Sequence, residues 1–423
     1  MKNVYELAME RIKFIFDEFD HVYISFSGGK DSGVMLNLAL KYLKDNNLNR
    51  KITLMHLDYE AQYEMTTKYV AQMEEEFKDY LNIYHVCVPF KVTTCTSMYQ
   101  SYWRPWEEDK KEIWVRDLPE NAMTKNDFPF FNENMWDYDF QEKLSTFIHE
   151  KENAEKTAVL VGIRTQESLH RWRAIHKERD TYYKNKNYSK KISDNVYNFY
   201  PIFDWKTEDV WVANAKFGFS YNELYDLYYL AGLDINQMRV ASPFISEGQD
   251  TLKLYKVIEP HTWGKLVSRV NGVNFTGLYG GTTAMGWKKI SKPDHLTWKE
   301  YMEFLLDTLP EETKNNYLSK LETSIKFWKE KGGVLSDEII QELDELEIKY
   351  EFGTHGYKTD KKAVKLDYLD DIDISDFKAI PTYKRMCICI LKNDHLCKYM
   401  GFSQTKTEMK KRKEAIEKYE KIL

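Results

Sequence analysis

The feature that most constrains the fold is a short β-rich run that ends at a pair of glycines and passes directly into a helical pattern. Residues 21–26 read HVYISF, Gly28 and Gly29 follow, and apolar residues recur at helical spacing from Ser32 to Leu43. Apolar runs and helical segments continue to alternate downstream, which predicts an α/β fold with a parallel sheet and helices on both faces. The other expected strands span residues 51–57, 81–88 and 157–161, and the other expected helices span residues 4–19, 62–80 and 140–152.

Right-handed crossovers would place the loops that follow these strands at one edge of the sheet, where ligands of open α/β folds bind. The first such loop, Ser27 to Ser32, reads SGGKDS. Its glycines let backbone N–H groups approach an anion closely, and the helix N-terminus and Lys30 add positive charge. Asp31 is suited to a magnesium ion. The loop therefore predicts a phosphate site, and the simpler alternative is a glycine turn capped by Ser32.

Three ordered motifs carry a resemblance to a known family. The run SFSGGKDSGVM resembles the phosphate loop of the PP-loop, or adenine nucleotide alpha-hydrolase, superfamily. Residues 162–168, GIRTQES, followed by Arg171, are similar to a signature that phosphoadenosine phosphosulfate (PAPS) reductases and ATP sulfurylases carry after their fourth strand. Residues 200–211, YPIFDWKTEDVW, resemble the segment that closes the same domain. The resemblance implies a Rossmann-like, PAPS reductase-like domain in this part of the chain.

Two arginines of the second motif are candidates for catalysis beside Lys30. Arg164 and Arg171 are seven residues apart, which puts them on one helical face if the helix has begun by Arg164, and guanidinium groups suit a pyrophosphate. Glu167 is able to orient one of them, and Gly162 opens the motif. The alternative is a surface ion pair between Glu167 and Arg171 at positions i and i+4.

The second expected strand ends near His56 and Asp58, where the resemblance implies contacts to the nucleoside. Asp58 would accept a hydrogen bond from a ribose hydroxyl or help to bind magnesium. The alternative is that it caps the next helix. The predicted nucleotide site comprises Ser27, Gly28, Gly29, Lys30, Asp31, Ser32, His56, Asp58, Gly162, Arg164 and Glu167, with Asp31 as the magnesium ligand and with Lys30, Asp31, Arg164 and Arg171 as the catalytic residues.

From Leu233 onward the alternation fades and helical patterns dominate, which predicts one domain over residues 1–232 and a mainly helical domain over 233–423. The second domain resembles one found on a PAPS reductase-like subgroup that is named after an immunoglobulin-binding regulator. That subgroup is often encoded beside a ParB-like partner in prophage or mobile DNA, so a ParB-like protein is an expected partner. Arg239, Asn274 and the turn at 280–282 are able to reach a second substrate. Helices are expected at 298–309, 311–331, 336–346 and 406–423.

The second domain also contains four soft metal ligands within eleven residues, Cys387, Cys389, His395 and Cys397. Such a set is able to bind zinc tetrahedrally. Its spacing is unusual for zinc, however, and the apolar residues around the cysteines predict a buried core strand instead.

Cysteine usage and charge exclude several classes of function. The chain has five cysteines and no CxxC pair, so it lacks the pairs that the resemblance would require of an iron-sulfur reductase or a tRNA thiolase of the two-thiocytidine type. The net charge of −6 argues against a generally basic nucleic-acid surface, although the basic stretches at 183–191 and 406–413 keep such contact open. Charge is present throughout the first residues, and no apolar run is long enough to span a bilayer, so we expect a cytoplasmic protein with reduced thiols.

The intact phosphate loop favours members of the superfamily that use ATP itself. The sequence therefore predicts an ATP pyrophosphatase that cleaves ATP between its α and β phosphates with Mg²⁺ and adenylates an acceptor. The resemblance to PAPS reductases implies a role in sulfur metabolism, but we do not expect a true reductase. Two alternatives stay open. One is a sulfur-transfer component of DNA or tRNA modification, and the other is a non-catalytic, nucleotide-sensing regulator that acts with the ParB-like partner.

Overall fold

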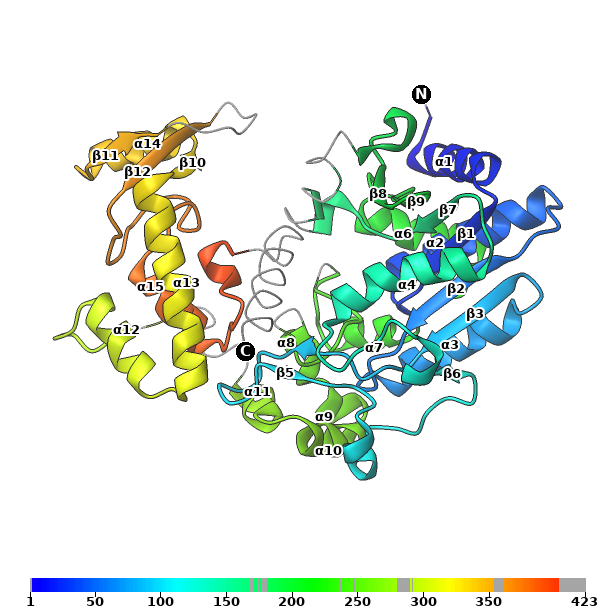
Figure 1. The fold of residues 1–423 in the computed structure, drawn as a ribbon, viewed down its shortest axis with the longest axis horizontal. Coiled ribbons are helices and arrows are strands. Elements are labelled where there is room, and N and C mark those ends of the chain that lie inside the picture. The colour runs from blue at the N-terminus through cyan, green and yellow to red at the C-terminus, as the bar shows by residue number, and fades with distance from the viewer. Residues whose placement is uncertain are drawn as a thin grey trace. The chain divides into compact units, whose positions relative to one another are not determined.

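The computed structural model describes residues 2–167, 171–172, 175, 181–235, 237–245, 248–279, 290, 292–353 and 361–402 (Figure 1). The chain forms two compact units. The N-terminal unit consists of Met1–Thr93 and Tyr102–Val273, and the C-terminal unit consists of Thr94–Ser101 and Asn274–Leu423.

A seven-stranded sheet lies at the centre of the described part of the N-terminal unit. Its order is β6-β3-β2-β1-β7-β9-β8, and β8 and β9 form the antiparallel pair in an otherwise parallel sheet. The predicted α/β class is confirmed, and the four expected strands are present, whereas the short β6 and the hairpin of β8 and β9 are not foreseen from the sequence. The strands are β1 (His21–Ser25), β2 (Ile52–Leu57), β3 (Leu81–Val86), β6 (Ala122–Met123), β7 (Thr157–Leu160), β8 (Ser189–Ser193) and β9 (Val196–Phe199).

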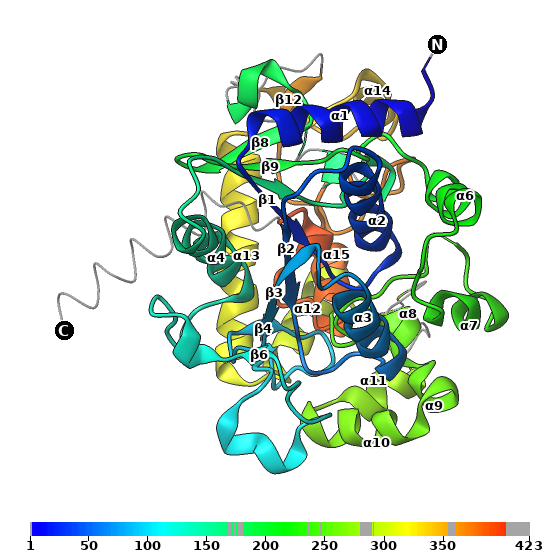
Figure 2. The same ribbon diagram turned by 90° about the vertical axis from the view of Figure 1, so that its right-hand side faces the viewer.

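Helices cover both faces of this sheet. Figure 2 shows α2 and α3 on one side of the strands and α4 on the other, and the apolar core is accordingly divided into two layers. Because both faces are covered, β2 is buried at every position, which explains why it reads as a continuous apolar run rather than an alternating one. The helices packed on the sheet are α1 (Val4–Glu18), α2 (Lys30–Asp45), α3 (Glu64–Glu76), α4 (Asp137–Lys151) and α6 (Thr207–Phe217).

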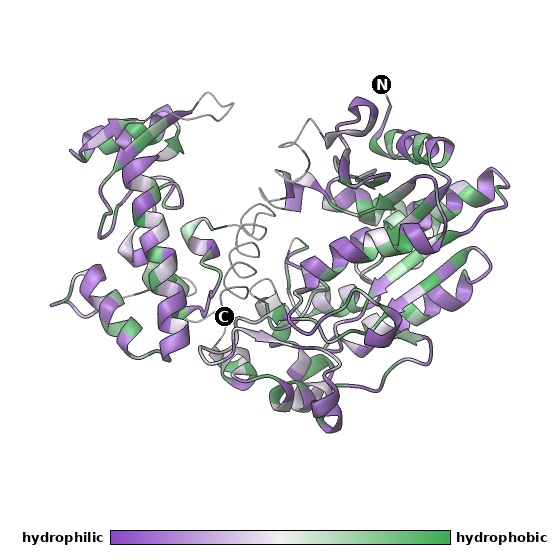
Figure 3. Cartoon of the chain, viewed as in Figure 1, coloured by the Kyte–Doolittle hydropathy of each residue, from purple (hydrophilic) through white to green (hydrophobic). Residues whose placement is uncertain are grey.

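The first helix shows how local sequence sets these elements. The Asn3 side chain accepts a hydrogen bond from the Glu6 N–H at 2.9 Å, and the Glu6 carboxylate accepts one from the Asn3 N–H at 3.0 Å, which together form a capping box. Ala8, Ile12 and Ile15 then recur at helical spacing and are fully buried. Figure 3 shows the resulting mixture of hydrophobic and hydrophilic residues along α1.

The N-terminal unit continues past its last strand through four short helices that pack near the ends of β2 and β3. The ring of Tyr63 stacks on that of Tyr255 at 3.6 Å, and the Tyr63 hydroxyl donates to the Thr251 carbonyl at 2.8 Å. Residues 233–273 therefore belong to the same compact unit as the sheet, and the domain boundary expected near Gly232 stays a prediction. These helices are α7 (Leu224–Leu230), α8 (Gln249–Leu252), α9 (Tyr255–Ile258) and α10 (Pro260–Arg269).

A buried ion pair fastens α10 to the loop after β2. Arg269 donates through Nε and Nη2 to the Glu60 carboxylate at 2.8 and 3.0 Å. Glu60 also accepts from the backbone N–H groups of Trp106 and Val115 at 2.7 and 3.0 Å. Glu60 is fully buried and has a positive φ of 63°, a conformation that costs energy for a residue with a side chain. Four hydrogen bonds to one carboxylate hold it there.

The C-terminal unit is mainly helical, as predicted, and also contains a three-stranded antiparallel sheet in the order β10-β12-β11 that the sequence does not predict. The segment 94–101 joins this unit because Thr276 and Thr313 donate to the carbonyls of Thr96 and Met98. Its main elements are α11 (Val273–Tyr279), which starts at the last residue of the N-terminal unit, and then α12 (Trp298–Asp307), α13 (Glu311–Glu330), β10 (Gly333–Leu335), α14 (Asp337–Glu345), β11 (Tyr350–Phe352), β12 (Lys362–Leu366) and α15 (Tyr383–Leu391).

Two sequence expectations for this unit need comment. The apolar stretch around Cys387 and Cys389, expected to be a buried strand, is instead the helix α15, whose Thr382 cap accepts from the Arg385 N–H. The turn at 280–282 and the helix and basic stretch expected from Lys406 lie outside the residues that the structure describes. Within the described ranges, no helix has the length and apolar character needed to span a bilayer.

We expect Arg269→Met to lower the free energy of unfolding of the N-terminal unit by about 3 kcal/mol or more, because it leaves the buried Glu60 carboxylate without its ionic partner. Urea denaturation followed by circular dichroism measures the loss. Lys13→Met is the control, since it removes the cation of an exposed pair with Asp17 and should change stability by less than about 1 kcal/mol. Equal losses in the two variants would contradict this account of the Glu60 ion pair.

Candidate functional site

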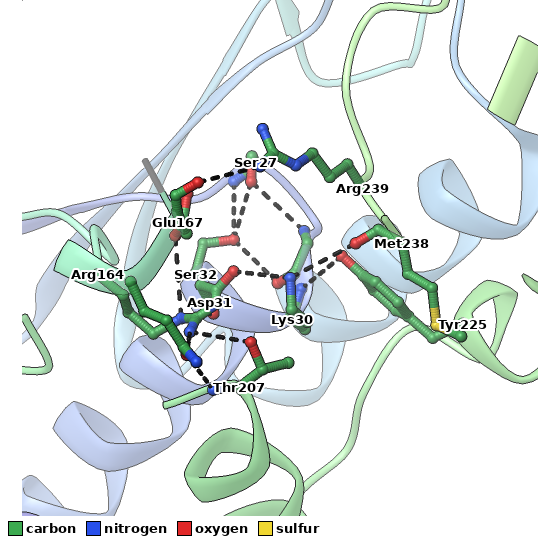
Figure 4. Close-up of polar contacts among 12 residues, drawn as sticks. Ser27, Lys30, Asp31, Ser32, Arg164, Glu167, Thr207, Tyr225, Met238 and Arg239 are labelled. Carbon is green, nitrogen blue, oxygen red and sulfur yellow. Dashed lines mark hydrogen bonds and ion pairs between the residues drawn. The ribbon is translucent and has the colours of Figure 1, made fainter. Parts of the chain in front are cut away.

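The candidate site lies where the strand order of the sheet reverses. β2 and β3 lie on one side of β1, and β7 and β9 lie on the other. In open parallel sheets, such a switch point leaves a crevice at the carboxyl ends of the two central strands, and ligands bind there. The loop after β1 and the loop after β7 meet at this point, and Figure 4 shows their side chains turned toward one another.

The phosphate loop from Ser27 to Ser32 is held by its own hydroxyl groups. The Ser27 and Ser32 hydroxyls lie 3.0 Å apart, the Ser27 N–H donates to the Ser32 hydroxyl at 3.2 Å, and the Ser32 hydroxyl donates to the Gly29 carbonyl at 3.1 Å. Gly28 has a positive φ of 72°, and a Cβ there would lie 2.9 Å from side-chain atoms of α3. The loop is therefore tight, and it leads straight into the N-terminus of α2.

Asp31 lies between two cations at the start of α2. Its Oδ1 accepts from the Arg164 Nε at 2.6 Å, and its Oδ2 lies 3.1 Å from the Lys30 Nζ. Arg164 is only 2% exposed, which is rare for an arginine and requires a fixed partner. The Arg164 Nε also lies 3.9 Å from the Glu167 carboxylate, which pairs in turn with Arg171. These five groups carry three positive charges and two negative charges, so a net positive charge lies at a helix N-terminus.

The third motif also contacts Arg164. The Arg164 Nη1 donates to the Thr207 hydroxyl at 3.2 Å and to the Gln166 amide oxygen at 3.3 Å. The same amide oxygen accepts from the Thr207 N–H at 2.9 Å. Thr207 begins α6 within the YPIFDWKTEDVW segment. All three motifs that are far apart in the sequence thus converge on one guanidinium group. Trp205 of this segment is buried in the apolar core of the N-terminal unit.

Gly162 allows the two loops to approach. A Cβ at this position would lie 2.7 Å from the Asp31 carbonyl oxygen and 3.0 Å from the Ser32 nitrogen, which is closer than side-chain carbons tolerate. Gly162 therefore belongs to the site for a steric reason: without a side chain, it allows Arg164 to come within reach of Asp31.

Arg164 and Arg171 do not share a helical face. The 3₁₀ helix η3 spans Thr165–Glu167 and begins after Arg164. The side chain of Arg171 is 44% exposed and pairs with Glu167, with 3.0 Å between Nε and Oε2. The surface ion pair considered as the alternative is therefore formed, and a catalytic role of Arg171 stays a prediction.

Two parts of the site, Tyr225 and the segment 238–240, lie outside the three sequence motifs and were not predicted from them. The Tyr225 hydroxyl accepts from the Lys30 N–H at 3.0 Å, and burial raises the pKa of this tyrosine well above its usual value. The Lys30 Nζ lies 3.5 Å from the Met238 carbonyl, and Arg239 donates to the Glu167 carbonyl at 3.4 Å. The segment 238–240 thus lines the phosphate loop (Figure 4). Of this segment, Arg239 was named above as able to reach a second substrate, but no spacing rule connects it to the loop.

His56 and Asp58 are buried, and His56 contacts Phe26, the residue that precedes the phosphate loop. The His56 Nδ1 donates to the Phe26 carbonyl at 2.8 Å, and Asp58 accepts from the Glu60 N–H, from the His85 Nε2 and from Arg116. Burial alone would raise the pKa of Asp58, but the charge of Arg116 and the hydrogen bond from His85 lower it well below its usual value. Both residues are essentially unexposed, and their nucleoside contacts stay a prediction.

Among the four soft ligands of the C-terminal unit, Cys389 and Cys397 contact each other, whereas Cys387 and His395 have separate partners. The Cys387 thiol donates to the Trp298 carbonyl at 3.6 Å, and the His395 Nε2 bonds the Ser97 carbonyl at 3.0 Å. All five cysteines are buried, and burial raises the pKa of Cys387 to about 12. In the described part of the chain, the group of metal-ligand side chains that does converge is His56, Asp58 and His85.

Comparison with known proteins identifies the family. The model for the phosphoadenosine phosphosulfate reductase domain matches residues 21–231, and the model for a domain of unknown function, DUF3440, matches residues 232–411. A protein of Escherichia coli (strain K12), the uncharacterized protein YbdN, is 32% identical over 412 residues, which cover 96% of this chain and 92% of that protein. The chain therefore belongs to the PAPS reductase-like family, in the group that carries this second domain.

Three solved structures have remote similarity to this chain. A PAPS reductase of Candida auris in its phosphate complex is 13% identical, with a TM-score of 0.31, over 56% of this chain and 87% of that one. The Candida glabrata FMN adenylyltransferase with ATP is 13% identical, with a TM-score of 0.32, over 52% and 57% of the two chains. The U34-tRNA thiolase NcsA of Methanococcus maripaludis is 12% identical, with a TM-score of 0.32, over 69% and 85%. Similarities of this size carry no argument about chemistry.

We expect Gly162→Ala to lower the free energy of unfolding of the N-terminal unit by about 1–3 kcal/mol, because the added methyl must push the loop after β7 away from α2. Gly264→Ala is a matched control, since a Cβ on Gly264 in α10 would meet no atom within 4 Å. In the interior of a helix, this control should be neutral or stabilising by up to about 1 kcal/mol. Thermal and urea denaturation compare the two variants, and an unchanged Gly162→Ala protein would contradict the close approach.

Proposed function

We propose that the N-terminal unit binds ATP at the phosphate loop and cleaves it between the α and β phosphates, transferring AMP to an acceptor. The observation that carries the proposal is the convergence of the three motifs on Arg164, which holds two cations, Lys30 and Arg164, on either side of Asp31 at the N-terminus of α2. A polyphosphate is the ligand that such an arrangement of charge and backbone N–H groups suits best.

In the proposed reaction, the β and γ phosphates lie against residues 27–32. The acceptor attacks the α phosphorus, a bond forms between the two, and the bond to the bridging oxygen breaks. The electron pair leaves with pyrophosphate, and an acceptor that carries a proton on its attacking atom loses that proton to solvent. Lys30 and Arg164 stabilise the charge that develops on the leaving group, and because both are positioned before the reaction, little reorganisation is needed.

Asp31 has a different part in this proposal from that of a simple metal ligand. Its two oxygens already face Arg164 and Lys30, so it keeps the two cations aligned before ATP arrives. Magnesium, carried by ATP, supplies charge neutralisation at the phosphates. If Lys30 turns toward the leaving group, the Asp31 oxygen that faces it becomes available to that ion.

The cysteines support transfer rather than reduction. A nucleophilic cysteine needs an accessible thiol with a lowered pKa. In this chain all five cysteines are buried, and burial raises the pKa of Cys87, Cys387 and Cys389. The acceptor is the open part of the proposal: sulfate, a nucleobase oxygen and a group on a ParB-like protein all suit the same loop.

We expect Lys30→Ala to lower the rate of pyrophosphate release from ATP and Mg²⁺ by about 100-fold, because one preorganised cation at the leaving group is lost. Arg164→Lys should also lower the rate, since it keeps the charge but cannot bond Asp31 and Thr207 together. Release is measured with purified protein alone and with sulfate, tRNA, DNA, a ParB-like protein or cell extract. Lys41→Ala is the control, because Lys41 lies on the same helix and pairs with Asp45.

An additive that accelerates release identifies the acceptor, and acceleration by nucleic acid would support the role in sulfur-transfer modification. If the wild-type protein binds ATP with normal stoichiometry but releases no pyrophosphate under any of these conditions, the transferase proposal fails. The nucleotide-sensing regulator is then the better account.

We also expect Arg239→Ala to lower kcat/KM for ATP by about 10-fold or more. Arg239 reaches the Glu167 carbonyl beside the phosphate loop, so its guanidinium is placed to contact a phosphate. Arg171→Ala is the comparison, because Arg171 contacts the same Glu167 through its carboxylate and is largely exposed. Steady-state kinetics of both variants give the answer. A full loss in Arg171→Ala with no change in Arg239→Ala would reverse the assignment.

A further inference from the structure

Three metal-ligand side chains meet at the carboxyl ends of β2 and β3, beneath the phosphate loop. His56 and His85 are direct neighbours in the parallel pairing of these strands, and Asp58 follows β2 directly. One ligand atom from each of the three lies within 4.8 Å of the other two. All three residues are buried, at 1%, 6% and 0% exposure for His56, His85 and Asp58.

The outward atom of each residue is held by a neighbour. The His56 Nδ1 lies 2.8 Å from the Phe26 carbonyl, and the His85 Nδ1 lies 2.9 Å from the Glu74 carboxylate. Asp58 Oδ1 accepts from the Glu60 N–H at 2.9 Å. An imidazole whose second nitrogen donates to a carbonyl or a carboxylate is the usual arrangement of metal-bound histidine, because that bond fixes the ring and its tautomer.

The supporting shell extends one step further. Arg116 bonds the same Asp58 oxygen, and the Asn121 amide donates to the second oxygen of Glu74 at 3.0 Å. Each ligand therefore has one atom that is fixed from behind and one that faces the common centre. This order is expected of a built site rather than of a chance cluster of polar residues.

The inward nitrogen of His56 distinguishes a metal site from a purely hydrogen-bonded network. The Phe26 carbonyl only accepts, so the imidazole proton is on Nδ1, and Nε2 presents a lone pair to the interior. That Nε2 is buried and has no hydrogen-bond partner. A buried nitrogen left in this state is unfavourable, because it has lost its hydrogen bond to water without gaining another. The hydrogen bonds of His85 and Asp58 do not relieve it, whereas a cation at the centre would.

The His85 Nε2 lies 2.9 Å from Asp58 Oδ2, so these two atoms share a hydrogen bond. A bound metal would replace the proton on the His85 Nε2, and that proton would pass to solvent on binding.

We propose that His56, Asp58 and His85 bind a divalent transition-metal ion through the two Nε2 atoms and a carboxylate oxygen of Asp58. Two imidazoles and one carboxylate form a set that suits zinc and its neighbours in the first transition row. The ion ties the ends of β2 and β3 to each other and, through Phe26, to the residue that precedes the phosphate loop. Its role is structural, because the ligands are closed off from solvent. The site is independent of the proposed ATP chemistry.

The test measures metal in the full-length chain. Purified protein is loaded with Zn²⁺, dialysed, and analysed by inductively coupled plasma mass spectrometry; we expect about one zinc ion per chain. Loading with Co²⁺ should give the visible absorption of a bound cobalt site. The melting temperature should rise with added Zn²⁺ and fall with a chelator, since a ligand that binds only the folded state stabilises it.

Two variants remove the inward nitrogen and keep the outward bond. In His56→Asn and His85→Asn, the amide nitrogen takes the place of Nδ1 and is able to donate to Phe26 or Glu74, while Nε2 is lost. Both should lose the zinc and the cobalt spectrum while keeping the far-ultraviolet circular dichroism of the wild type. His21→Asn is the matched control, because His21 is a buried imidazole of β1 that bonds Thr53 and Thr157 outside the cluster. It should keep the metal.

A second control separates this site from the cysteines of the C-terminal unit. Cys389→Ser should leave the zinc content unchanged, and a loss there would assign the metal to that unit and overturn the proposal. The proposal also fails if the wild-type chain takes up none of Zn²⁺, Co²⁺, Mn²⁺, Fe²⁺ or Ni²⁺, or if folded His56→Asn keeps its zinc. The metal readouts are independent of pyrophosphate release, so failure of this site and failure of the ATP proposal are distinguishable.

Discussion

The ion pair between Arg164 and Asp31 is the interaction on which the candidate site depends. It joins the loop after β7 to the first turn of α2, and its partners at Thr207 and Gln166 bring in the start of α6. A buried guanidinium needs several fixed acceptors, because leaving any of its donors unpaired away from water is costly. Three segments that are separated by more than a hundred residues at their extremes are therefore held in one register by a single side chain, and the glycine at 162 provides the space that this requires.

A second buried ion pair, between Arg269 and Glu60, holds the segment after residue 233 against the N-terminal unit. Arg269 on α10 and Glu60 after β2 pull residues beyond 233 into the compact unit of the sheet. This is why Met238 and Arg239, which fall within the match to the domain of unknown function, lie against a phosphate loop that falls within the match to the reductase domain. The boundary between the two family matches and the boundary between the two packed units fall at different residues. In this chain they are about forty residues apart, since one ends at 231 and the other at 273.

Much of the fold and part of the site could be predicted from the sequence, and the limits have physical causes. The central strands are recognisable because burial on both faces makes them continuous apolar runs, and the phosphate loop is recognisable because its glycines and charged residues are adjacent. The contact of Arg164 with Asp31 follows from both loops lying at one sheet edge. Tyr225 could not be predicted, because nothing local links a tyrosine of α7 to Lys30. The stretch at Cys387 was misjudged because a short apolar run with cysteines fits a helix and a strand equally well, and only the cap at Thr382 and packing in the folded unit decide between them.

The two clusters at the carboxyl edge of the sheet differ in how they balance charge. Around Asp31 and Glu167 there are three cations, Lys30, Arg164 and Arg171, for two carboxylates, so an anion is needed for balance. Around Asp58 there are two carboxylates, those of Asp58 and Glu74, with Arg116 as the fixed cation and His85 as a group that gains or loses a proton. The charge of the first cluster suits the polyphosphate proposed above. In the second cluster the Nε2 of His56 is buried without a hydrogen-bond partner, and the proposed metal would satisfy it. Since the His56 Nδ1 bonds the carbonyl of Phe26, the residue that precedes the phosphate loop, a metal bound as proposed would also help to position the start of the loop.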